Sequence, residues 1–139
     1  MADPGSGGCI FCAIVAGDAP AKLIHEDEST LAFLDINPIT VGHSLVIPKR
    51  HSVDLHQISH DDLAAVTRSA KLVAGLLTER LGCDGVNLLN ATGAAAWQTV
   101  FHFHIHVLPR VAGDIPFPFP LRGVDDTELQ TLHDRITGR

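Results

Sequence analysis

Residues 102–108 read His-Phe-His-Ile-His-Val-Leu, and this alternation of imidazoles with apolar side chains predicts a β-strand over residues 100–108. Because successive side chains of a strand point to opposite faces, His102, His104 and His106 would lie on one face, roughly 6–7 Å apart from Cα to Cα. The apolar residues between them would fill the other face and anchor the strand in the core: Phe101, Phe103, Ile105 and Val107. The pattern therefore predicts a rigid element that presents three imidazoles in a row.

Three uses of such a row remain open. The histidines can be plain surface residues on an exposed sheet face, or they can be the three imidazole ligands of a catalytic metal. The third use is nucleophilic catalysis, because imidazole attacks phosphorus well and forms a labile phosphoramidate. A neighbour can hold the second ring nitrogen and fix the tautomer, and a flanking histidine can protonate the leaving group.

Around this segment, the pattern of apolar residues and turn formers predicts a small number of strands and helices. Short strands are expected over residues 22–25, 30–34, 44–48 and 86–89, and a final helix over 125–136. The longest helix is expected over residues 61–81. Ser59 would cap its start and Gly82 would end it. This order of elements predicts an α+β fold, an antiparallel sheet of about five strands flanked by a long helix and shorter terminal helices.

The length and composition indicate a single domain. The chain has 139 residues, of which 45% are hydrophobic. Residues 1–8 are rich in Gly and Ser and are predicted to be a disordered lead, with one domain over 9–139 that includes a C-terminal extension, 111–139. No stretch approaches the roughly 20 apolar residues of a membrane helix, and the N-terminus lacks the features of a secretory signal, which predicts a cytoplasmic protein without a membrane partner.

The charge argues against long nucleic acid as a partner. The formal net charge is −6, and the only pair of adjacent basic residues is Lys49 and Arg50. Such a chain lacks the clustered basic residues with which proteins bind a polyanion. A pocket of amides and imidazoles can still bind one small anion.

The motif at 102–108 resembles the signature of the histidine triad (HIT) family of nucleotide hydrolases and transferases, and is similar to its histidine triad nucleotide-binding (Hint-like) branch. The resemblance extends over roughly residues 9–110. It also rests on these segments: 33–38, 42–49, 87–90, the Gly93 loop and 98–100. It implies a small-molecule purine nucleotide of the AMP or GMP type as substrate, and bond cleavage at its α-phosphorus.

The resemblance also implies roles for individual residues. His104 would be the nucleophile that takes the nucleotidyl group, and His106 would orient the phosphate and relay a proton to the leaving group. The residues expected to bind the substrate are Phe33 and Ile36 beside the purine, Asp35 on the ribose hydroxyls, His43 at the same pocket, and Asn90, Gln98, Thr99 and Val100 on phosphate and leaving-group oxygens. From the residues alone, Asp35 can instead be a turn former, and Asn90 can be a loop residue bonded to its own backbone.

Cys9 and Cys12 form a CxxC pair, for which a redox motif and plain buried thiols are the alternatives to a metal site. Bacterial-type members of the family that carry CxxC bind zinc with it and two histidines. The positions similar to theirs are His51 and His102. Two thiolates and two imidazoles would make a closed, structural zinc site.

One residue departs from the family pattern. The family usually has glycine before the glutamine, and here Trp97 stands before Gln98. Glycine allows positive φ and a close approach of the backbone to phosphate, whereas tryptophan adds bulk to the loop. Trp97 would therefore change which leaving groups fit, stack on a base, or cover the site.

The leading hypothesis is an enzyme that hydrolyses nucleoside phosphoramidates or dinucleoside polyphosphates through a covalent nucleotidyl-histidine. The resemblance also implies a homodimer. Two alternatives stay open. One is a zinc metallohydrolase with the triad as ligands, and the other is a non-catalytic module for nucleotide sensing or protein interaction.

Overall fold

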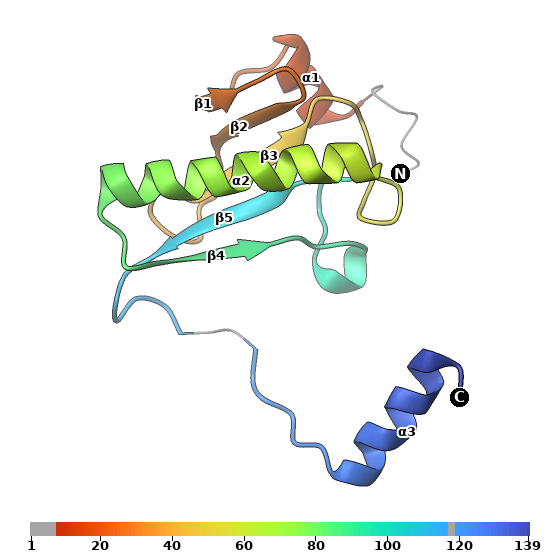
Figure 1. Cartoon of the computed structure of the whole chain (residues 1–139). Coiled ribbons are helices and arrows are strands. Elements are labelled where there is room, and N and C mark those ends of the chain that lie inside the picture. Colours follow the sequence, from red (N-terminus) through yellow and green to blue (C-terminus); the bar gives the residue numbers. More distant parts are fainter. Residues whose placement is uncertain (1–7, 117–118) are drawn as a thin grey trace.

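The computed structural model describes residues 8–116 and 119–139, and in them the chain forms one antiparallel sheet with helices on both faces (Figure 1). The strand order is β1-β2-β3-β5-β4. The strands are β1 (Leu23–Glu26), β2 (Thr30–Leu34), β3 (Ser44–Pro48), β4 (Gly85–Leu89) and β5 (Ile105–Arg110). The helices are α1 (Ile10–Ala16), α2 (His60–Leu81), α3 (Asp126–Thr137) and a short 3-10 helix, η1 (Ala94–Ala96). The predicted α+β fold is confirmed.

Helix α2 covers one face of the sheet, where Figure 1 shows it lying across β3 and β5. Its ends follow from local chemistry. The Ser59 side chain accepts a hydrogen bond from the amide of Asp62, and Gly82 adopts φ +69° at the C-terminal cap. The apolar stripe of the helix packs on the sheet and is buried: Val66, Ala70, Val73 and Leu77. None of the described helices has both the length and the apolar composition needed to cross a membrane.

Helix α1 packs on the opposite face of the sheet. Its Phe11 is buried against Leu31, Phe33, Leu45 and Ile47, the alternate residues of β2 and β3 that point away from α2. Leu45 stands opposite His106 in the pairing of β3 with β5. Because directly paired residues share a face, His106 lies on the α1 side of the sheet.

The predicted strand over residues 100–108 is wrong at its start, because β5 begins only at Ile105. The pairing of β3 with β5 starts at Val46 and Ile105, and before that point the amide of Phe103 bonds to the carbonyl of Ser52 at 2.6 Å. His102 and His104 therefore lie on an irregular segment. Phe103 is buried as expected, whereas Phe101 is exposed.

The sequence predicts a disordered lead at the N-terminal end of the chain and a helix at the C-terminal end, and the structure describes only the second of these regions in full. The proposed lead over 1–8 lies outside the described residues except for Gly8. At the other end, α3 begins and ends one residue later than expected. No α3 residue is buried, and Figure 1 shows this helix apart from the sheet, at the end of an extended arm.

Candidate functional site

His104 lies just before β5, and one of its two ring nitrogens, Nδ1, is hydrogen-bonded to the backbone. Its Nδ1 lies 2.8 Å from the carbonyl oxygen of His102, so Nδ1 carries the proton and donates it. The Asn90 side-chain amide donates to the His104 carbonyl at 3.0 Å, and the Phe11 ring lies nearly perpendicular to the His104 imidazole, with ring centroids 5.2 Å apart. This arrangement leaves the Nε2 lone pair for a substrate. The side chain is 5% exposed, and burial lowers its pKa.

His106 is bonded to His43, and the backbone decides which nitrogens carry protons. The Ile39 amide donates to His43 Nδ1 at 3.0 Å, so the proton of neutral His43 is on Nε2. That proton is donated to His106 Nδ1 at 2.9 Å, which leaves the His106 proton on Nε2. Burial, with the neighbouring His104 and His43, lowers the pKa of His106 to about 4. The His104 and His106 ring centroids lie 4.8 Å apart.

A cavity of about 260 Å³ opens beside Asp35 on the α1 side of the sheet. The structure brings three of the predicted substrate residues to this cavity: Phe33, Asp35 and Ile36. One Asp35 oxygen lies 3.4 Å from His43 Nε2, and the other accepts a hydrogen bond from the amide of Asn37. Asp35 is therefore both a turn former and a member of this site.

Sequence reasoning missed the α1 wall of the cavity. Ile10 and Ile14 line it together with Pro20 and Leu45. The spacing of four residues between Ile10 and Ile14 is a helical signal that was present in the sequence. Only the packing of α1 shows that these residues face the cavity.

The other predicted binding residues divide into two groups. Asn90 and Gln98 are bonded to main chain: Gln98 donates to the carbonyls of Val53 and Val100 and accepts from the amide of Gly93. These bonds position the segment that carries the histidines. Thr99 is exposed, and Val100 packs partly against the α1-side core.

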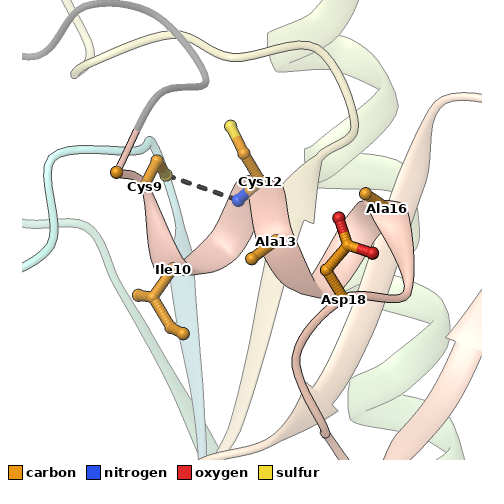
Figure 2. A pocket seen from close by; sticks show the side chains of 7 residues that line it. Cys9, Ile10, Cys12, Ala13, Ala16 and Asp18 are labelled. Atoms are coloured by element: carbon orange, nitrogen blue, oxygen red, sulfur yellow. Dashed lines mark hydrogen bonds between the residues drawn. The ribbon is translucent and has the colours of Figure 1, made fainter.

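Cys9, Cys12, His51 and His102 come together as a second cluster, with one ligand atom of each within 4.8 Å of all the others. Figure 2 shows both thiols at the start of α1, where the Cys12 amide donates to Cys9 Sγ. Cys12 Sγ lies 3.2 Å from His51 Nδ1, and Cys9 Sγ lies 3.4 Å from His102 Nδ1. The two Nδ1 atoms are 3.2 Å apart.

This cluster has the chemistry and the dimensions of a metal site. The edges of a tetrahedron around zinc are about 3.3 Å between two nitrogens and about 3.6 Å between nitrogen and sulfur, close to the distances found here. His102 Nε2 donates to the Pro48 carbonyl at 2.8 Å, which places the proton on that nitrogen and turns the Nδ1 lone pair toward the thiols. The four residues can therefore hold a metal ion.

Trp97 occupies a backbone conformation that explains why glycine is usual there. Its φ is +74°, in the left-handed region, directly after η1. The indole is 63% exposed and stacks on Phe119, with ring centroids 5.2 Å apart and planes 11° apart. Trp97 does not line the cavity beside Asp35.

The fold and the two histidine clusters define a histidine triad protein, and comparison with known proteins agrees. A family model for the HIT domain matches residues 16–113. The chain belongs to the HIT family. An uncharacterized HIT-like protein of Methanocaldococcus jannaschii is 45% identical over 106 residues, which cover 76% of this chain and 81% of that one. The adenylylsulfatase HINT3 of Arabidopsis thaliana is 41% identical over 76% of this chain and 54% of its own length.

Solved structures share this fold. The SMU.412c protein of Streptococcus mutans superposes with a TM-score of 0.89 at 38% identity, over 95% of this chain and 85% of that one. A histidine triad nucleotide-binding protein of Candida albicans gives 0.84 at 32% identity, over 94% and 96%. A zinc-bound histidine triad family protein of Mycobacterium smegmatis gives 0.76 at 42% identity, over 97% and 100%. Family and relatives together indicate a nucleotide hydrolase or transferase.

Proposed function

We propose that the protein cleaves purine nucleotides at the α-phosphorus through a covalent nucleotidyl-His104 intermediate. The observation that carries this proposal is the hydrogen bond from His104 Nδ1 to the His102 carbonyl. With that nitrogen occupied, the Nε2 lone pair is the nucleophile. It forms a bond to phosphorus as the bond to the leaving group breaks, and water then attacks the same phosphorus to release a nucleoside monophosphate.

The cavity beside Asp35 supports binding of the nucleoside. Its apolar lining suits a purine, for which Phe33 and Ile36 would be the walls, and the Asp35 carboxylate would accept from the ribose hydroxyls. His43 bonds to His106 and lies 3.4 Å from an Asp35 oxygen, which brings the three side chains together. The exposed Thr99 and the Val100 amide would meet phosphate oxygens, while Asn90 and Gln98 act by positioning the segment.

His106 is the group that returns a proton to the leaving group. Its proton is on Nε2, because Nδ1 accepts from His43. The negative charge of a bound phosphate favours the protonated imidazole and raises the pKa of His106 above its value in the free protein. The added proton would occupy Nδ1, and His43 Nε2 would then donate to the Asp35 carboxylate, 3.4 Å away, instead of to His106. His106 can therefore act as a general acid after the substrate binds.

The second cluster would hold a structural zinc ion. Cys9, Cys12, His51 and His102 supply four protein ligands, which closes a tetrahedral site and leaves no position for a substrate. The zinc-bound relative supports this metal. The homodimer and the cytoplasmic location stay predictions.

The test of this function is fast chemical quenching of the protein with an adenosine 5′-phosphoramidate, followed by mass spectrometry. An adduct of AMP on His104 is expected. His104→Gly is expected to lower kcat by about 10⁴-fold while AMP still binds. If wild-type protein binds AMP tightly but turns over neither phosphoramidates nor dinucleoside polyphosphates, the protein is a nucleotide-sensing or interaction module instead.

A further inference from the structure

A second cavity, of about 320 Å³, has no role in the proposed binding of the nucleoside. It lies across His106 from the cavity beside Asp35, because His106 pairs with Leu45 of that cavity on one side and with Leu89 of the second cavity on the other. We call it the Trp97 cavity. It is lined by Ile39, Thr40, Asn87, Leu88, Leu89, Trp97, Leu108, Arg110, Ile115 and Phe119. Two of its lining residues contact the histidines of the proposed catalytic site. Leu89 pairs with His106 across the sheet, and the Ile39 amide donates to His43. Leu108 follows His106 by two residues on β5, so it lies on the same face.

The lining of the Trp97 cavity suits an uncharged aromatic group. Most of it is apolar, and the one charged lining residue, Arg110, is already neutralised. Its guanidinium donates to the Asp114 carboxylate at 3.0 Å from Nε, and to Asn87 at 2.9 Å from Nη1. The cavity thus offers no unpaired cation to an anionic leaving group among its described residues.

Two further groups can receive a ligand there. Trp97 stacks on Phe119 through one face, and its high exposure leaves ring surface for a second aromatic partner. The Thr40 hydroxyl is buried and has no hydrogen-bond partner among the described residues, so it can bond to a nitrogen or oxygen of a bound molecule.

We infer that the Trp97 cavity is the leaving-group subsite, and that it selects phosphoramidates of primary amines that carry an aromatic ring. This inference rests on the proposed function. The P–N bond breaks, its electron pair stays on nitrogen, and His106 Nε2 supplies the proton that makes a neutral amine. The aromatic ring of that amine would stack on Trp97 during the step.

The test compares two adenosine 5′-phosphoramidates, one of 2-phenylethylamine and one of methylamine. For the wild-type protein, kcat/KM is expected to be about tenfold higher with the phenylethyl substrate, and Trp97→Gly is expected to remove this preference. Glycine adopts the positive φ of this position freely, so the loop backbone is kept. Phe119→Ala is the second variant and should lower the same ratio. Leu121→Ala is the matched control on the same arm, since Leu121 is 97% exposed, and it should change neither value.

Trp97 is the only tryptophan of the chain, so its fluorescence reports on the cavity without any turnover. In the His104→Gly protein, the phenylethyl phosphoramidate is expected to shift the emission, whereas AMP is not. An equal shift with AMP, or a substrate ratio that Trp97→Gly leaves unchanged, overturns the subsite. If the wild-type protein cleaves neither substrate, the proposed function is wrong, and the fluorescence comparison still decides the subsite.

Discussion

The Ile39 backbone amide decides the protonation of two histidines. It occupies His43 Nδ1, so His43 donates from Nε2, and His106 in turn accepts at Nδ1. The carbonyl of His102 does the same for His104. Main-chain groups therefore give the two neighbouring rings opposite tautomers: His104 presents a lone pair, and His106 presents a proton. A nucleophile and an acid of the same residue type can work side by side for this reason.

We predict that His106 titrates far below the ordinary histidine range in the free protein. Burial and the two neighbouring imidazoles favour the neutral ring, and its pKa is about 4. The unfolded chain takes up this proton near pH 6.5, so the contribution of His106 to the free energy of unfolding is lost as pH falls from 6.5 toward 4. NMR titration of the His106 ring protons measures the midpoint. Asp35, His43 and His104 face the ring, and a midpoint at or above 6.5 would contradict their arrangement.

At the scale of elements, the β1–β2 turn is bonded to α2 through one carboxylate. Asp27 accepts hydrogen bonds from the amides of Ser29 and Thr30 and from the hydroxyls of Thr30 and Ser69. Ser69 is buried in the middle of α2. The network holds the hairpin in register over the helix.

We predict that Asp27→Ala lowers the free energy of unfolding by about 2 kcal/mol. It leaves the buried Thr30 amide without an acceptor, and of the Thr30 and Ser69 hydroxyls, which lie 2.7 Å apart, only one can still donate to the other. Urea denaturation measures this change. Glu28→Ala, one residue along the same exposed turn, is the control and should stay within about 0.5 kcal/mol of wild type. Equal effects of the two substitutions would show that the network is not the cause.

Helix α1 has seven residues, too few to be stable alone, and it supplies one wall of the cavity beside Asp35. The metal cluster joins its N-terminal end to His51 and His102. Metal bound there would therefore stabilise the helix and the cavity together.

We predict that chelation, or Cys12→Ser, lowers Tm by about 10 °C or more, as expected for a loss of several kcal/mol in a domain of this size. Calorimetry with and without added zinc measures the shift. Cys83→Ser is the control, because Cys83 lies outside the cluster. A chelated protein with unchanged Tm and reversible loss of turnover would instead indicate a catalytic metal.

At the scale of the whole molecule, the single chain leaves apolar surface uncovered at one edge. β4 is an edge strand, and its Leu88 is 50% exposed. The apolar residues of α3 are also exposed. Edge strands and apolar patches of this kind are often covered by a second chain.

We predict a homodimer in solution, with a mass of about 30 kDa from a chain of 14.9 kDa. Sedimentation equilibrium at micromolar concentration measures it. Ile136→Lys places a charge among the exposed apolar residues of α3 and should weaken the dimer, whereas Leu72→Lys on the exposed side of α2 adds the same charge and is the control. A monomeric mass for the wild type would contradict the prediction.

The sequence by itself determined the parts of this protein that depend on neighbours along the chain. Ser59 and Gly82 mark the ends of α2 to within one residue, and β2 and β3 have the predicted bounds. The triad signature determined the family and pointed to His104 and His106. These features were predictable because helix caps, strand alternation and a contiguous motif are local.

The tertiary structure alone decided what depends on distant contacts. The amide of Phe103 bonds to the carbonyl of Ser52, so β5 begins later than expected. The Pro48 carbonyl accepts from His102 Nε2, which turns His102 Nδ1 toward the thiols. Both cavities, the one beside Asp35 and the Trp97 cavity, are likewise built from segments far apart in sequence. The residues themselves were visible in the sequence, but which ring nitrogen carries a proton is set by backbone groups that only the folded chain brings to each histidine.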